Sequence, residues 1–319
     1  MIVSLFRQSK EVFTMIGKRL RLGDTIGLIS PASPENIEAI KKAILFLSNL
    51  GFNVIQGKHL YDRWGYLAGR DKDRASDVME MFENKSVDMI LCIRGGYGSS
   101  RLLPYLDYDI IKKNPKIFAG FSDITVFLNV FYEKCGLTTF HSPMGTSNLE
   151  DMVTFKSFMF TLMEGYKPYI IKNPDDYKTL CVTQGIAEGS LIGGNLGLIC
   201  NLLGTPYEID MTDKILFVEE VNEAPYRVDR ILTQLLLSNK FNKCNGIILG
   251  QFKDCGLPNY ERSLTLEEVL QDRLYNLDIP MFSGFCSGHD YPKLTLPIGA
   301  RVRMNAKLGT VNVLDAVVE

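Results

Sequence analysis

The chain alternates short apolar runs with longer amphipathic segments through its first half. The short runs are almost continuously apolar, as strands buried on both faces are, and they occupy residues 25–32, 52–57, 87–93 and 116–121. The segments between them repeat apolar residues with the spacing of a helix that buries one face, at residues 34–51, 71–86 and 123–136. This order predicts a parallel sheet covered by helices.

The pattern changes near residues 164–179, a polar segment with two prolines that we interpret as a link between domains. Beyond it strands dominate, at residues 214–221, 244–252, 281–286 and 301–314, with helices at 224–240 and 264–277. We therefore expect a mixed α/β second domain with some antiparallel pairing. The predicted division is an N-terminal extension at 1–16, a first domain at 17–165, a linker at 166–185 and a second domain at 186–319.

Composition narrows the classes of protein that fit. The chain of 319 residues is 46% hydrophobic with a net charge of -2, which fits a folded globular protein and argues against nucleic-acid binding. Its apolar runs are too short to span a membrane. The first twenty residues do not read as a signal peptide, so we expect a cytoplasmic protein whose translation starts at Met1 or Met15. Seven cysteines without a C-x-x-C pair predict reduced core residues and no zinc site.

Three loops follow predicted strands, where parallel sheets place their ligands. They read "SPASP" at 30–34, "RGGYGSS" at 94–100 and "GFSD" at 120–123. The glycines of the second loop can turn backbone N–H groups toward an anion, either a phosphate or the oxyanion of an acyl transfer. The loop lacks the lysine and the spacing of a Walker motif, which favours the oxyanion.

Ser122 stands where the strand at 116–121 turns into a helix, and two interpretations are open. A serine there is a common helix N-cap, with Asp123 favourable beside it. A sharp turn that exposes a nucleophile is the alternative, although Ile124 replaces the second glycine of the usual G-x-S-x-G.

A serine nucleophile needs a base, and the chain has three histidines, His59, His141 and His289. His59 lies in a polar loop and His141 ends a strand, whereas His289 lies on a loop after the apolar run at 281–286. An acid that orients the imidazole is available at Glu219 or Glu220, after the strand at 214–221. These acids could equally pair with a nearby arginine on the surface.

Nine motifs in this order resemble the LD-carboxypeptidases, also called muramoyltetrapeptide carboxypeptidases. They cover residues 17–313 and read "LGDTIGLISPASP", "GYLAGRDKDRASDVMEMF", "IRGGYGSSRLLPYLD", "GFSDIT", "TFHSPMG", "GGNLGLICNLLGTP", "VEEVNEAPYRVDRIL", "GIILGQF" and "SGHDYPKLTLPIGARV". The resemblance implies a flavodoxin-like or glutamine-amidotransferase-like first domain with helices on both faces of a parallel sheet. It implies a swivelling-type mixed α/β second domain.

The resemblance also implies a catalytic triad of Ser122, Glu219 and His289. The expected oxyanion donors are the backbone N–H groups of Asp123 and Gly96, or Gly95. The candidate substrate-binding residues are Arg94, Asn195 and Arg227. No metal or cofactor is expected.

Two departures from the family pattern bear on these assignments. His141-Ser142-Pro143 stands where the family usually has H-G-P, and Glu219-Glu220 stands where it often has E-D. We expect Glu219 to be the triad acid, because neighbouring strand residues face opposite sides and Glu219 aligns with the family acid.

The expected substrate is a murein tetrapeptide, cleaved at the L,D-amide bond to its terminal D-alanine during peptidoglycan recycling, and the expected assembly is a homodimer. The alternative enzyme is a peptidase that detoxifies microcin C-like aminoacyl-nucleotides, which we rank lower because the single tryptophan, Trp64, is distant in sequence from the triad motifs. A non-catalytic binding module with the same fold is the third possibility.

Overall fold

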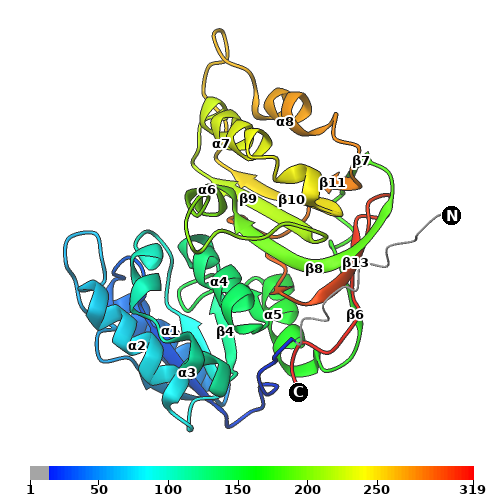
Figure 1. Cartoon of the computed structure of the whole chain (residues 1–319). Coiled ribbons are helices and arrows are strands. Elements are labelled where there is room, and N and C mark those ends of the chain that lie inside the picture. Colours follow the sequence, from blue (N-terminus) through cyan, green and yellow to red (C-terminus); the bar gives the residue numbers. More distant parts are fainter. Residues whose placement is uncertain (1–13) are drawn as a thin grey trace, which may run out of the picture.

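The computed structural model describes residues 14–319, so most of the predicted extension at 1–16 lies outside the described residues. The chain forms two lobes, each built on its own sheet, with helix α4 (Thr125–Cys135) packed between them (Figure 1). Within the described residues, no helix combines the length and the apolar character needed to cross a membrane. The two-domain α/β architecture predicted from the sequence is confirmed.

The first sheet has six strands in the order β12-β5-β4-β3-β1-β2. Five of them run parallel, and β12 pairs antiparallel with β5 at the edge. The strands are β1 (Thr25–Ile29), β2 (Asn53–Gln56), β3 (Met89–Cys92), β4 (Ile117–Gly120), β5 (Thr139–His141) and β12 (Leu296–Ile298). The helices of this lobe are α1 (Ile37–Asn49), α2 (Asp71–Glu83), α3 (Tyr108–Lys113) and α4, with 3-10 turns η1 (Ser99–Tyr105) and η2 (Ser122–Ile124).

Local sequence explains where these helices begin, what they bury and where they end. Asn36 caps α1, because its side chain accepts a hydrogen bond from the N–H of Glu38 at 2.8 Å. Ile40, Ala43 and Leu47 recur every three or four residues and are the buried face of α1. Helix α4 ends at Gly136, whose φ of 72° is the left-handed conformation that glycine adopts at little cost.

The second sheet has eight strands in the order β6-β14-β13-β8-β9-β10-β11-β7. The four strands β8 to β11 are parallel, and the outer strands pair antiparallel, as the sequence pattern predicts. The strands are β6 (Tyr169–Lys172), β7 (Leu180–Thr183), β8 (Ile186–Asn195), β9 (Ile215–Val221), β10 (Gly246–Lys253), β11 (Met281–Ser283), β13 (Arg301–Asn305) and β14 (Thr310–Val313). Strands β6 and β7 therefore fall within the segment 166–185 that was interpreted as a linker.

The remaining helices cover this second sheet or lie beside it (Figure 1). Thr265 and Glu268 begin α8 with a reciprocal capping box, and Pro225 begins α7, where a missing N–H costs nothing. The helices are α5 (Met152–Glu164), α6 (Leu196–Asn201), α7 (Pro225–Leu237) and α8 (Leu266–Leu274), with the 3-10 turn η3 (Phe241–Lys243).

The end of β8 fastens the second lobe to α4 of the first. Asn129 exchanges two hydrogen bonds with the backbone of Gly193, at 2.8 and 2.9 Å. The N–H of Asn195 donates to Thr125 Oγ1 at 2.9 Å. All of these groups are buried, so the bonds join the lobes directly behind the turn that carries Ser122.

Candidate active site

Ser122 lies on a strained turn between β4 and α4. Its φ is 63°, and the other described non-glycine residues with positive φ are all Asp or Asn, which tolerate this conformation better. Its side chain caps neither η2 nor α4, so the N-cap interpretation is wrong. Strain of this kind costs roughly 1–2 kcal/mol and tends to persist at functional sites.

The glycine loop packs against this turn. A Cβ added to Gly95 would lie 2.9 Å from Ser122 Cβ and 3.0 Å from Ser122 Oγ. The next glycine, Gly96, has φ of 114° and approaches Ser33 so closely that a Cβ would lie 2.4 Å from its Oγ. Ser33 Oγ also accepts the N–H of Tyr97 at 3.1 Å. The three loops singled out in the sequence therefore meet at one edge of the first sheet.

Asp123 anchors the turn from the other side. Its carboxylate is almost fully buried, and Oδ2 accepts the N–H of Ser99 at 2.8 Å. Burial raises the pKa of this carboxyl group, and the hydrogen bonds from Ser99 oppose the shift. The side chain of Asp123 therefore has a structural role, which leaves only its backbone N–H as a candidate oxyanion donor.

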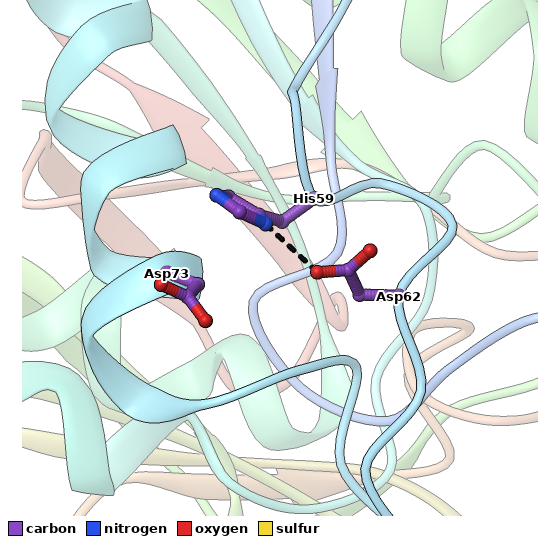
Figure 2. A group of neighbouring side chains, drawn as sticks. All are labelled: His59, Asp62 and Asp73. Carbon is purple, nitrogen blue, oxygen red and sulfur yellow. Dashed lines mark hydrogen bonds and ion pairs between the residues drawn. The ribbon is translucent and has the colours of Figure 1, made fainter.

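His59 belongs to an acidic group on the first lobe. Its Nδ1 lies 2.8 Å from Asp62 Oδ2, and Asp73 on α2 completes a group whose ligand atoms lie within 4.8 Å of one another (Figure 2). The hydrogen bond with Asp62 is the main cause of a raised pKa at His59. The acids around His59 favour its charged form, which makes it a poor candidate for a general base.

His141 at the end of β5 is fully buried between aromatic rings. Its ring centroid lies 5.8 Å from that of Phe121 and 5.1 Å from that of Phe217, and neither ring nitrogen has a hydrogen-bond partner among the described residues. Burial lowers the pKa of His141 well below 6.5, with smaller contributions from the charges of Lys293 and His289. His141 is therefore neutral when the protein is folded.

This neutral histidine predicts a specific pH dependence of stability. Below pH 6.5 His141 is protonated in the unfolded chain, whereas its lowered pKa keeps it neutral in the folded chain. The free energy of unfolding therefore decreases as the pH is lowered, by up to about 1.4 kcal/mol per pH unit. Above pH 6.5 both states are neutral and the effect is absent. We expect His141→Phe to reduce the slope of stability against pH between pH 5 and 6.5, measured by urea unfolding.

His59→Gln is the matched control for this measurement. The pKa of His59 is raised, so its contribution is present below its unfolded pKa and is lost as pH rises through its folded pKa. The slope below pH 6.5 should therefore not change in His59→Gln. An unchanged slope in His141→Phe would show that His141 is protonated in the folded protein.

His289 forms a short contact with a buried acid at the junction of the lobes. Its Nδ1 lies 2.5 Å from Glu219 Oε2, and its side chain is 15% exposed whereas that of Glu219 is fully buried. Glu219 follows the apolar part of β9. His289 follows Gly288, and a Cβ added to Gly288 would lie 3.1 Å from Glu219 Oε2, so the two segments are in close contact. The two residues are 70 positions apart in the sequence, and the structure brings them together as predicted.

The neighbouring Glu220 points into a different set of contacts. Its carboxylate accepts hydrogen bonds from Asn195 Nδ2 at 2.6 Å, from the N–H of Gly197 at 2.8 Å and from the N–H of Val221 at 2.9 Å. Asn195 also caps α6 through Leu198, so both polar groups of its side chain have partners inside the protein. Glu220 and Asn195 together organise the β8–α6 junction.

Phe121 connects the two lobes at the site, and sequence reasoning missed it. Its ring centroid lies 4.8 Å from that of His289, and the Nζ of Lys293 lies over the same ring at 3.4 Å from the centroid. Because Phe121 directly precedes Ser122, this contact brings the turn and His289 together. The local sequence around Phe121 carries no signal of this role, because His289 and Lys293 come from a distant segment of the chain.

The two predicted arginines lie in different surroundings. Arg94 directly precedes Gly95, and its guanidinium lies 3.8 Å from Glu35 and within reach of the carbonyl of Pro34. Arg227 is exposed on α7 and contacts Glu223 and Tyr226. Arg94 therefore lies beside the Ser122 turn, whereas the contacts that Arg227 makes among the described residues do not reach the predicted triad.

Two family models match the chain, one on each lobe. The LD-carboxypeptidase N-terminal domain matches residues 26–142, and the LD-carboxypeptidase C-terminal domain matches residues 188–304. The chain belongs to the LD-carboxypeptidase family. It is accordingly a serine-type carboxypeptidase, a hydrolase.

Relatives of this LD-carboxypeptidase include murein peptide carboxypeptidases and a microcin self-immunity protein. The probable murein peptide carboxypeptidase of Bacillus subtilis is 40% identical over 299 residues, which cover 90% of this chain and 91% of that protein. MccF, the microcin C7 self-immunity protein of Escherichia coli, is 31% identical, covering 91% of this chain and 93% of that protein. A solved structure of MccF in complex with glutamyl sulfamoyl guanosine matches at 28% identity with a TM-score of 0.86, covering 95% and 99% of the two chains. The muramoyltetrapeptide carboxypeptidase from Oxalobacter formigenes matches at 31% identity with a TM-score of 0.81, covering 91% and 99%.

The contact of Gly95 with Ser122 predicts the effect of one added methyl group on this LD-carboxypeptidase. In Gly95→Ala the new Cβ would lie 2.9 Å from Ser122 Cβ, so the turn must shift. A displacement near 1 Å at a reacting group costs roughly 100-fold in rate, and we expect a loss of that size in kcat/KM. Steady-state kinetics with an unchanged melting temperature would check this, and wild-type kinetics would contradict it.

Proposed function

We propose that the protein is a carboxypeptidase that removes the terminal D-alanine of murein tetrapeptides by hydrolysing the L,D-amide bond, as a step in peptidoglycan recycling. The observation that carries the proposal is the hydrogen-bonded pair of His289 and Glu219, which lies against Phe121, the residue before the strained Ser122. A hydroxyl, an imidazole and a buried carboxylate in this order are the elements of a serine-hydrolase triad.

Each member of the triad has a defined task in the proposed reaction. Glu219 accepts a hydrogen bond from His289 Nδ1, which fixes the tautomer and leaves Nε2 to take the proton of Ser122. Ser122 Oγ attacks the carbonyl carbon of the L,D-amide bond and forms a tetrahedral oxyanion. His289 then protonates the departing amine of D-alanine, and water, activated by the same imidazole, hydrolyses the acyl-enzyme.

The oxyanion is held by backbone donors at the beginning of α4 and in the glycine loop. The N–H groups of Asp123 and Gly96 are the proposed donors, because a Cβ added to Gly95, which directly precedes Gly96, would lie 3.3 Å from the backbone nitrogen of Asp123. No described residue accepts a hydrogen bond from the N–H of Gly96. One such donor is typically worth about 3 kcal/mol of transition-state stabilisation, and the helix N-terminus adds a favourable dipole.

A carboxypeptidase must also recognise the free carboxylate of its leaving group. We assign this to Arg94, because a guanidinium binds a carboxylate through two hydrogen bonds and Arg94 lies next to Gly95 at the turn. Glu35 Oε2 lies 3.8 Å from the guanidinium of Arg94 and helps to orient it. Arg227 is the alternative, and its surface contacts favour it less.

A direct assay tests the substrate class. The protein is incubated separately with a murein tetrapeptide ending in D-alanine, the corresponding tripeptide and an aminoacyl sulfamoyl adenosine, and the products are followed by mass. Loss of one alanine from the tetrapeptide alone supports the proposal. Cleavage of the aminoacyl sulfamoyl adenosine alone would replace it with the second candidate below.

The second candidate is hydrolysis of aminoacyl-nucleotides, which a surface aromatic cluster favours. Trp64, Tyr66 and Tyr97 are about half exposed or more, and the rings of Tyr66 and Tyr97 lie 5.7 Å apart. Tyr97 belongs to the glycine loop, so this contact places Tyr66 beside the loop, and the Trp64 ring lies 5.9 Å from the guanidinium of Arg101, directly after the loop. Exposed rings can stack on a nucleobase. Tyr66→Ala should then raise KM for the nucleotide substrate and leave the KM for tetrapeptide unchanged.

A further inference from the structure

Lys293 is a buried lysine that no step of the proposed reaction uses. Its residue is 1% exposed, and its Nζ lies 3.4 Å from the ring centroid of Phe121 and 5.2 Å from that of Tyr291. The hydrogen bond that Lys293 makes within residues 14–319 comes from its backbone N–H, which donates to Thr154 Oγ1 at 2.8 Å. A buried ammonium is unfavourable unless a charge or an aromatic face compensates it.

Two acids act electrostatically on Lys293, and they differ in burial. Asp290 is half exposed, and its Oδ2 lies 3.0 Å from Lys253 Nζ, so its charge already has a lysine partner. Glu219 is fully buried; its Oε2 contacts His289, and its Oε1 has no hydrogen-bond partner among the described residues. Glu219 is therefore the buried acid that can balance the charge of Lys293, beside its contact with His289.

The ring of Phe121 contacts both this lysine and the imidazole of the proposed triad. Lys293 Nζ lies over the ring, and the imidazole of His289 contacts it at 4.8 Å between centroids. Phe121 itself is extended, and the backbone changes to the strained conformation at the next residue, Ser122. A cation attracted to the ring face holds the ring in place, and with it the entry to the turn.

We propose that Lys293 is a positioning residue: its ammonium is the counter-charge of Glu219, and its contact with Phe121 holds the Ser122 turn against His289. This inference rests on the proposed triad. It assigns to Lys293 no contact with the substrate, so its loss should lower kcat with little change in KM.

The titration of Lys293 adds a property that can be measured. Burial lowers the pKa of Lys293 to about 7, while the charges of Glu219 and Asp290 act in the opposite direction. The other titratable groups that face it are His141 on β5 and His289 on its own loop. The counter-charge is therefore lost as pH rises through about 7, and activity should fall on that side.

Three variants separate charge from packing. Lys293→Met keeps the length of the side chain without the charge, Lys293→Arg keeps a charge at every accessible pH, and Lys253→Met removes the exposed partner of Asp290 as a matched control. We expect Lys293→Met to lower kcat roughly tenfold or more with KM within about twofold and to lose the decline of kcat/KM near pH 7. Lys293→Arg should extend activity to higher pH, and Lys253→Met should follow the wild type.

A double-mutant cycle in thermal stability tests the charge pairing independently of activity. Glu219→Gln and Lys293→Met each leave one buried charge alone, whereas the double variant leaves none. We expect the melting temperature of the double variant to be no lower than that of the less stable single variant. Additive losses, or a Lys293→Met enzyme with the kcat and pH profile of the wild type, would overturn the proposal.

These outcomes also separate this inference from the proposed function. If Lys293→Met is unchanged while Ser122→Ala is inactive, the triad stands and the role of Lys293 is wrong. If Ser122→Ala retains activity, the triad itself fails. Should Lys293→Met not fold, the pH profile of Lys293→Arg still decides, because an unchanged alkaline decline would exclude the titration of Lys293.

Discussion

Replacing Ser122 by alanine is expected to lower kcat/KM for the tetrapeptide by roughly 10⁴-fold or more, with KM changed little. The reason is that Ser122 Oγ is the only proposed nucleophile, and what survives is the contribution of the oxyanion donors and of substrate binding. Labelling by a serine-directed fluorophosphonate should vanish in the same variant. Steady-state kinetics and intact-mass spectrometry measure both effects.

Two further serine variants are the controls for this prediction. Ser33→Ala removes only the acceptor of the Tyr97 N–H, so labelling should persist and kcat/KM should stay within about tenfold of the wild type. Ser122→Gly should be as inactive as Ser122→Ala but more stable by about 1 kcal/mol, because glycine adopts a φ of 63° without strain. Labelling that survives in Ser122→Ala would remove Ser122 as the nucleophile.

The second large effect is expected from Glu219→Gln, which should lower kcat by roughly 10⁴-fold. An amide at this position cannot stabilise the imidazolium that forms on His289, and it can hold the wrong tautomer of the ring. Glu219 Oε2 is the atom that His289 contacts, at 2.5 Å, so the change acts directly on the proposed base. The measurement is single-turnover kinetics on the tetrapeptide.

Glu220→Gln is an unusually close control, because it makes the same chemical change one residue further along the same strand. Glu220 accepts three hydrogen bonds from Asn195, Gly197 and Val221, and an amide nitrogen there would face donors. We expect a loss of about 1–3 kcal/mol in the free energy of unfolding and less than a tenfold loss in kcat. The reverse pattern would identify Glu220 as the triad acid.

The parts of the structure that depend on local pattern could be predicted from the sequence. Buried parallel strands and amphipathic helices repeat their apolar residues at fixed spacings, so β1 to β4 of the first sheet and α1, α2 and α4 were found. The pairing of His289 with Glu219 was predicted from the family resemblance, because the residues alone left Glu219 and Glu220 both open. The strands and helices, in contrast, carry their own signal, and little information about distant contacts is needed to find them.

Features that depend on contacts between distant segments could not be predicted in this way. The end of β8 looks like a loop because of Gly193 and Gly194, yet there the backbone passes so close to its neighbours that a Cβ on Gly194 would lie 2.5 Å from Thr125 Oγ1. The N-cap interpretation of Ser122 failed because the residue adopts a φ of 63° where Gly95 packs against it, and its side chain caps neither η2 nor α4. The role of Phe121 is visible only once both lobes are in place.

One strand has a consequence for protein engineering. Leu296–Ile298 belongs to the later part of the chain but pairs with Thr139–His141 in the sheet of the first lobe, and the chain re-enters the other sheet at Arg301. Chimeras that join the first lobe of one homologue to the second lobe of another would therefore mismatch this edge. Recombination between homologues should succeed only when residues 296–298 are inherited together with the N-terminal parent.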